Sequence, residues 1–117
     1  MAVSEVDIWH NPRCSKSRAA LALIEAHGLT PRPRLYLTDP PDADALRAML
    51  AALGLPAAAL LRPEGKALAD QPEDRIIAAL AADPRLIERP LLRWGNRAVI
   101  ARPPENALPL LQQAQSG

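Results

Sequence analysis

The chain contains one cysteine, Cys14, in a short polar stretch between an expected strand and an expected helix. Backbone N–H groups in the first turn of a helix have no partner inside it, and the helix dipole there favours negative charge. A thiolate at this point is stabilised, so we expect the pKa of Cys14 to lie below its ordinary value of about 8.5. The pattern favours a nucleophile; the alternative is a cysteine that fills a small apolar gap.

Positive charge is concentrated around this cysteine. Arg13, Lys16 and Arg18 flank it, and His10 lies upstream and adds charge when it is protonated. Two of these residues also have a structural interpretation. His10 can be a strand-end histidine held by hydrogen bonds, and Arg18 can be a cation on an exposed helical face.

The same loop has the features of an anion-binding site. The backbone N–H groups of Ser15, Lys16 and Ser17 would lie at the helix start, where oxyanions bind. The structural alternative for Ser17 is simply to begin the helix. Ser17 also stands where a Cys-x-x-Cys redox protein has its second cysteine. No disulfide within the chain can therefore resolve an oxidised Cys14, and any redox cycle needs an external thiol.

Length and composition limit the class of protein. The 117 residues include 14 basic and 13 acidic ones, with a net charge of +1, so we expect one domain over residues 1–117 and no nucleic-acid partner. No apolar run approaches the roughly 20 residues that span a bilayer, and residues 1–7 lack the pattern of a signal peptide. One cysteine excludes an internal disulfide framework and a Cys-rich metal site. We expect a cytoplasmic protein without a membrane partner or a bound metal.

The hydrophobic pattern places these residues on a βαβ unit followed by helices and a hairpin. It predicts strands over residues 6–9 and 34–37, parallel to each other and joined by a helix over 15–27 that ends at Gly28. Further helices are expected over 43–53, 56–61 and 73–82, with an irregular polar stretch over 62–71. A hairpin over 91–94 and 97–100 precedes a last helix over 104–113. This order predicts an α/β domain with a small mixed sheet.

The loop residues and several later blocks resemble one known family. Residues 10–18, His-Asn-Pro-Arg-Cys-Ser-Lys-Ser-Arg, resemble the active-site loop of the glutaredoxin-coupled arsenate reductases, in the branch with this Arg-Cys-Ser-Lys-Ser-Arg run. The similarity continues, in family order, at residues 35–37 with the following Pro40–Pro41, at 60–62, at 88–90 and at 101–105. Together these blocks extend over nearly the whole chain. The resemblance implies a thioredoxin-like fold with a helical insertion.

The resemblance also implies roles for particular residues. Cys14 would be the nucleophile, and the family's three anion-binding arginines correspond to Arg62, Arg89 and Arg102. Such arginines would offset the repulsion between a thiolate and an anionic substrate. Each also has a structural alternative; Arg62, for example, can be a solvated cation at a helix end. The Arg89–Pro90 bond would be the cis-proline bond that thioredoxin-like folds keep beside the active cysteine.

The remaining loop residues correspond to the family's cysteine-activating group. His10 would tune the cysteine without acting as an obligatory base, and Ser15, Lys16 and the Ser17–Arg18 pair would complete the loop.

The implied reaction is the reduction of arsenate or a similar oxyanion. The Cys14 thiolate would displace a hydroxyl from arsenate, glutathione would attack the adduct, glutaredoxin would supply further reducing equivalents, and arsenite would leave. The resemblance further implies that the protein binds no cofactor and that glutathione is a co-substrate. Two alternatives stay open: a monothiol, glutaredoxin-like redox protein without arsenate activity, and a Spx-like transcriptional regulator that binds RNA polymerase. Spx-like regulators commonly carry a Cys-x-x-Cys switch, which this chain lacks at Ser17.

Overall fold

The computed structural model of the chain describes residues 5–116. Residues 1–4 and residue 117 lie outside the described residues. The expectation that residues 1–7 do not form a signal peptide therefore falls partly on residues that are not described. The strands are β1 (Glu5–Trp9), β2 (Thr30–Arg34), β3 (Leu91–Trp94) and β4 (Arg97–Ile100). The α-helices are α1 (Ser15–Ala26), α2 (Ala43–Leu53), α3 (Glu73–Ala82) and α4 (Leu108–Ser116). Short 3-10 helices are η1 (Ala57–Leu60), η2 (Pro63–Leu68), η3 (Pro84–Leu86) and η4 (Pro104–Ala107).

The four strands form one mixed sheet in the order β2-β1-β3-β4. β1 runs parallel to β2, with Trp9 opposite Arg34, and antiparallel to β3, where Trp9 faces Leu91. β3 and β4 form the expected hairpin around Gly95, whose φ of 62° suits a residue without a side chain. The expectation of an α/β fold with a small mixed sheet is confirmed.

The second strand lies earlier in the chain than predicted. We expected it over residues 34–37, but β2 covers Thr30–Arg34, and a turn follows in which Asp39 N–H donates to Leu35 O at 2.8 Å. Pro31 and Pro33 are unusual in a strand, because proline has no backbone N–H to donate to the hydrogen-bond ladder. β2 is an edge strand, however, where only one side of the backbone needs donors, so it tolerates both prolines. The parallel pairing of β1 with β2 is as predicted.

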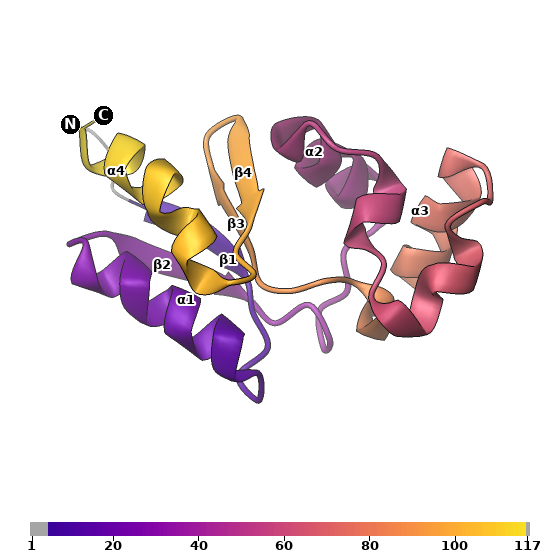
Figure 1. Cartoon of the computed structure of the whole chain (residues 1–117), viewed down its shortest axis with the longest axis horizontal. Coiled ribbons are helices and arrows are strands. Elements are labelled where there is room, and N and C mark those ends of the chain that lie inside the picture. Colours follow the sequence, from indigo (N-terminus) through magenta and orange to yellow (C-terminus); the bar gives the residue numbers. More distant parts are fainter. Residues whose placement is uncertain (1–4, 117) are drawn as a thin grey trace.

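Helices cover both faces of the sheet (Figure 1). On one face, Ile8 of β1 and Leu92 of β3 pack with α1 and α4 through buried residues such as Ile24 and Leu111. On the other face, Trp9 and Leu91 belong to a second cluster that includes α2 and α3. The alternation of Ile8 and Trp9 along β1 therefore serves both layers.

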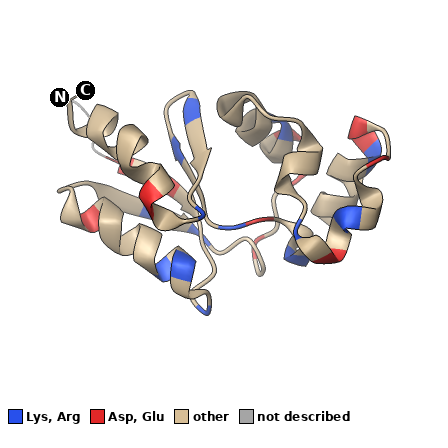
Figure 2. Ribbon diagram, viewed as in Figure 1, with Lys and Arg blue, Asp and Glu red and all other residues tan. Residues whose placement is uncertain are grey.

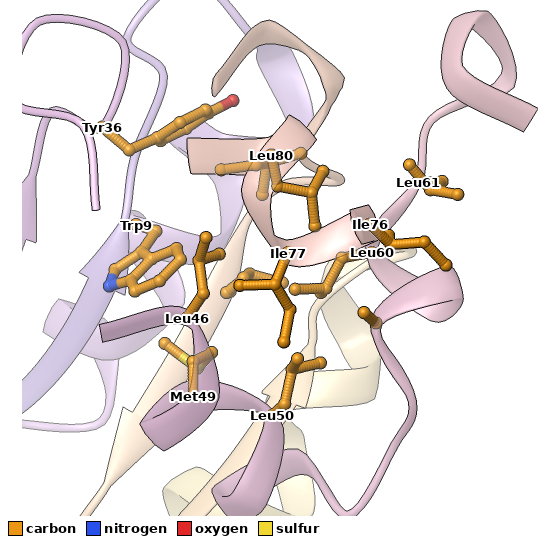
Figure 3. Packing of buried hydrophobic residues seen from close by; sticks show 13 residues of the cluster. Trp9, Tyr36, Leu46, Met49, Leu50, Leu60, Leu61, Ile76, Ile77 and Leu80 are labelled. Carbon is orange, nitrogen blue, oxygen red and sulfur yellow. The ribbon is translucent and has the colours of Figure 1, made fainter. Parts of the chain in front are cut away.

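A helical block made of residues 43–87 extends the second face. Leu46, Met49 and Leu50 of α2 face Ile77 and Leu80 of α3 within one buried apolar cluster (Figure 3). This block is the expected helical insertion. In residues 5–116, no helix is long and apolar enough to cross a membrane.

The segment before η2 and the segment at the end of η3 meet at one side of the helical block. Leu61 and Ile87 form an isolated antiparallel bridge. Arg62 N–H donates to Leu86 O at 2.9 Å, and Glu88 N–H donates to Leu60 O at 2.6 Å. These bonds bring Arg62 beside Glu88, although 25 residues of chain, 63–87, separate them. The bridge thus carries one side of the site described below.

Candidate active site

Cys14 is the N-cap residue of α1, directly after the loop that leaves β1. Its backbone is extended (φ −95°, ψ 122°), its N–H donates to Asn11 O at 2.9 Å, and its carbonyl accepts from Arg18 N–H at 3.0 Å. The side chain makes no capping bond to the helix backbone as a serine hydroxyl would, and it is partly exposed. A polar loop and a helix start therefore present Sγ at the surface.

The electrostatic surroundings of this thiol favour the thiolate. Partial burial raises the pKa of Cys14, but the backbone N–H groups of Ser17 and Lys16, together with the charge and hydrogen bond of Arg102, lower it by more. The net pKa is below the ordinary value. This agrees with the direction that the sequence predicts for a cysteine at a helix N-terminus.

Arg102 places a guanidinium beside the sulfur. Its Nη1 lies 3.9 Å from Cys14 Sγ and donates to Arg89 O at 3.2 Å. The peptide bonds Arg89–Pro90 and Arg102–Pro103 are both cis, including the one that the resemblance singles out. Arg102 and Arg89 follow and precede the β3–β4 hairpin, so antiparallel pairing brings the two together.

Glu88 lies between the arginines and links them. Its Oε1 is 3.6 Å from Arg62 Nη1 and 3.8 Å from Arg102 Nε. The same Oε1 accepts a hydrogen bond from Arg89 N–H at 3.3 Å. Charged residues of both signs lie along the segment that joins α3 to β3 (Figure 2). One carboxylate thus lies between the guanidinium groups of Arg62 and Arg102 and also accepts from the backbone of Arg89.

Two guanidinium atoms in this cluster remain available to a ligand. Among the described residues, Arg62 Nη1 and Arg89 Nε are buried without a hydrogen-bond partner. Buried N–H groups that lack a partner are costly, so a ligand that accepts hydrogen bonds from them would be stabilised. Both arginines line a cleft of about 210 Å³, together with Asn11, Tyr36, Leu37, Glu64 and Arg85.

Tyr36 also faces this cluster. Burial raises the pKa of its phenol to about 12; Arg62 opposes that shift, and the charges of Cys14 and Glu88 add to it. Figure 3 shows its ring at the edge of the apolar cluster. A neutral hydroxyl therefore lies within electrostatic reach of the sulfur.

A buried histidine–serine pair holds the loop in place. His10 Nδ1 and Ser17 Oγ are 2.6 Å apart, and Asn11 N–H donates to the same Oγ at 3.0 Å. Burial, and then the charge of Arg18, lower the pKa of His10. Because Ser17 Oγ already accepts from Asn11 N–H, its hydroxyl proton is free to be donated to Nδ1. The pair joins β1 to α1.

The structure brings some of the expected site residues together and leaves others outside. Cys14, Arg62, Arg89, Pro90 and Arg102 form one cluster.

The side chains of Ser15, Lys16 and Arg18 are exposed. Arg18 donates to Pro12 O at 2.8 Å and so braces the loop from outside. Of these three, Lys16 lowers the pKa of Cys14, through its backbone N–H and not through its side chain.

Sequence reasoning gave no role to three residues of this site: Glu88, Tyr36 and Asn11. The one available signal was position: Glu88 directly precedes Arg89, and Asn11 lies in the loop itself. Tyr36 was hidden because the strand was predicted over its position, whereas it lies in the turn after β2.

A larger cleft is lined by residues of β1, β2 and β3. It has a volume of about 390 Å³, and its lining includes Trp9, Arg32, Arg34 and Arg93, whose Nε donates to Gly95 O at 2.8 Å. Arg32 pairs with Asp7 at 3.2 Å, while Arg34 pairs with Asp39 at 3.5 Å and lies 6.0 Å from the Trp9 ring. Within residues 5–116, no group of three or more His, Cys, Asp or Glu side chains is placed to hold a metal ion.

The chain is similar to known proteins over most of its length. Residues 9–109 match the profile of the ArsC family. The chain is 40% identical over 115 residues to the uncharacterized protein YfgD of Escherichia coli, covering 92% of this chain and 97% of that relative. It is 38% identical over 110 residues to an arsenate reductase of Neisseria meningitidis, covering 87% and 94% of the two chains. A solved arsenate reductase from Vibrio cholerae superposes with a TM-score of 0.85 at 38% identity, over 93% and 98% of the chains.

Proposed function

The chain belongs to the ArsC family and has a thioredoxin-like fold, and from this premise we propose that it is an arsenate reductase whose nucleophile is Cys14. Residues 1–117 act as one domain. Glutathione is the co-substrate and glutaredoxin the protein partner, so the reaction belongs in the cytoplasm, where a thiol stays reduced. The observation that carries the proposal is the distance of 3.9 Å between Arg102 Nη1 and Cys14 Sγ at a helix N-terminus.

Arsenate binds through the guanidinium groups and the helix start. Arg62, Arg89 and Arg102 supply fixed N–H donors, two of which lack a hydrogen-bond partner within residues 5–116. The backbone N–H groups at the start of α1 add a second set of donors. Donors that are already oriented stabilise the charge that develops in the transition state.

The first step is attack by the Cys14 thiolate on arsenic. An S–As bond forms, and one arsenate hydroxyl takes a proton and leaves as water, so arsenic stays pentavalent. His10 is not required as the base of this step, and its Nδ1 is engaged with Ser17. The proton has already left the thiol, since the helix N–H groups and Arg102 favour the thiolate.

External thiols then complete the reduction. The glutathione thiol displaces a second hydroxyl as water, which leaves arsenic bound to two sulfurs. A glutaredoxin thiolate attacks the glutathione sulfur and forms a mixed disulfide, and the electron pair of the broken S–As bond reduces arsenic to the trivalent state. Water finally displaces Cys14 and releases arsenite. External thiols are required because Ser17 stands where a resolving cysteine would be.

The test is arsenate-dependent oxidation of NADPH, coupled through glutathione reductase, with glutathione and glutaredoxin supplied. Cys14→Ser should abolish turnover. Arg102→Ala should lower kcat/KM by about 10²–10³-fold, the usual loss for one oriented donor. Arg97→Ala, which removes an exposed hairpin arginine, is the matched control and should leave turnover unchanged.

Other results would favour the alternatives. A folded protein that exchanges glutathione mixed disulfides without reducing arsenate would be a monothiol redox protein. A protein that binds RNA polymerase and shows no thiol turnover would be a Spx-like regulator. Either result would overturn the reductase proposal.

A further inference from the structure

Glu88 is an acid at the centre of a site that binds an anion. Its side chain is 20% exposed, and its Oε1 lies within 4 Å of guanidinium nitrogen atoms of Arg62 and Arg102 and accepts from the backbone N–H of Arg89. A carboxylate here reduces the net positive charge of the site, which is the opposite of what binding an anion needs. Its presence calls for a reason beyond charge.

The guanidinium of Arg102 places the carboxylate next to any bound substrate. Nη1 of Arg102 faces Cys14 Sγ at 3.9 Å, while Nε faces Glu88 Oε1 at 3.8 Å. The second arginine, Arg62, has its unpartnered Nη1 3.6 Å from the same oxygen. An oxyanion that hydrogen-bonds to both arginines beside Sγ therefore also contacts Glu88.

The contacts of Glu88 with the two guanidinium groups leave their N–H groups free to bind. The distances of 3.6 and 3.8 Å exceed those of good charge-assisted hydrogen bonds, which are about 2.7–2.9 Å. Glu88 accordingly orients Arg62 and Arg102 by charge without using up their donors. A ligand with oxygen atoms nearer to these nitrogens gains hydrogen bonds that the carboxylate does not make.

An ionised carboxylate only accepts hydrogen bonds. It repels a bare anionic oxygen but binds an oxyanion that carries a hydroxyl. Near neutral pH, arsenate and phosphate each keep at least one hydroxyl, whereas sulfate has none. We propose that Glu88 is a specificity-determining residue that admits hydroxyl-bearing tetrahedral oxyanions and rejects sulfate. The inference rests on the proposed function, because it assumes that the arginine cluster binds the substrate.

Rejection follows from placing an oxygen without a hydrogen against a largely buried carboxylate. A site built to bond a hydroxyl discriminates strongly against an analogue that lacks it, because the carboxylate then faces a bare anionic oxygen instead of a donor. Glu88 is largely buried, so water compensates it poorly. Glu64 offers a comparison: it also pairs with Arg62, at 3.5 Å, but its side chain is 63% exposed, so solvent screens its charge.

The test measures binding of inorganic phosphate and of sulfate to the full chain by isothermal titration calorimetry near neutral pH. The wild type should bind phosphate at least about tenfold more tightly than sulfate, as expected for a hydrogen bond to a charged group. Glu88→Gln should reduce this preference to about threefold or less through a gain in sulfate affinity. Glu64→Gln removes the same charge from the same arginine and should keep the wild-type preference.

Three results would overturn the inference. They are a wild type that binds sulfate as well as phosphate, a Glu88→Gln variant that keeps the full preference, and a variant that loses both anions while its thermal unfolding midpoint is unchanged. Phosphate is not reduced, so these outcomes are separate from turnover. Arsenate reduction without selectivity rejects this inference alone, and selectivity without reduction rejects the reductase proposal alone.

Discussion

At the scale of the residue, the reactivity of Cys14 depends on groups from opposite ends of the chain. The helix start supplies backbone N–H groups of Lys16 and Ser17, and Arg102 arrives from beyond the hairpin. Partial burial alone would raise the pKa of the thiol, so the lowered value is a balance that these groups decide. The balance can be tested by removing the arginine.

Arg102→Ala should raise the pKa of Cys14, because the positive charge that favours the thiolate is gone. Alkylation by iodoacetamide proceeds through the thiolate, so its rate at pH 7 should fall, and the midpoint of its pH profile should move to higher pH. Arg97→Ala is the control, since this exposed arginine makes no contact with the sulfur. An unchanged profile in Arg102→Ala would mean that the helix N–H groups alone set the thiol pKa.

At the scale of the element, the joint between β1 and α1 fixes the loop that carries the cysteine. Ser17, in the first turn of α1, is fully buried, and its hydroxyl binds both His10 at the end of β1 and the N–H of Asn11. This explains a serine that the sequence left ambiguous. Its contacts are to the loop and not to the sulfur, so its side chain positions Cys14 from behind.

Ser17→Ala should lower the free energy of unfolding by about 1–3 kcal/mol, because a buried N–H and a buried ring nitrogen lose their partner. Urea denaturation measures this. Ser15 lies two residues earlier and is exposed, so Ser15→Ala should change the free energy of unfolding by less than about 0.5 kcal/mol. Equal effects of the two substitutions would contradict the bracing role of Ser17.

At the scale of the whole molecule, the site lies between the segments that flank the sheet and the helical block of residues 43–87. Cys14 and Arg102 belong to segments next to the sheet, whereas Arg62 comes from the helical block. The bridge between Leu61 and Ile87 and the carboxylate of Glu88 connect the two. A bound oxyanion would bridge the same two parts, so binding should stabilise the folded chain as a whole.

Phosphate should therefore raise the free energy of unfolding, by about 2.7 kcal/mol at a free concentration one hundred times its Kd. Chloride at equal ionic strength is the reference. Arg62→Ala should remove most of the increment, because it deletes the helical block's contribution to the site. Arg47→Ala, which breaks a surface pair with Asp74 in the same block, should keep it. An increment unaffected by Arg62→Ala would place the anion elsewhere.

Much of the architecture follows from local rules in the sequence. The apolar spacing of α1, the Asp42 cap and Gly54 end of α2, and the Gly95 turn of the hairpin are signals within one element. The position of Cys14 at a helix N-terminus is equally local. The error in β2 arose where local rules conflict with context, since only the sheet order shows that its prolines lie at an edge.

Local patterns in the chain thus predicted the order of elements, the mixed α/β class and the cysteine at the start of a helix, and the resemblance singled out the arginines. Packing of distant segments places Glu88 between Arg62 and Arg102, turns Tyr36 toward the same site and leaves the Arg18 side chain outside it. The physical reason is the distance along the chain between the residues that determine each feature. Helix starts and turns depend on neighbouring residues, whereas the contacts of Glu88 depend on a bridge and a hairpin that form only when distant segments pack together.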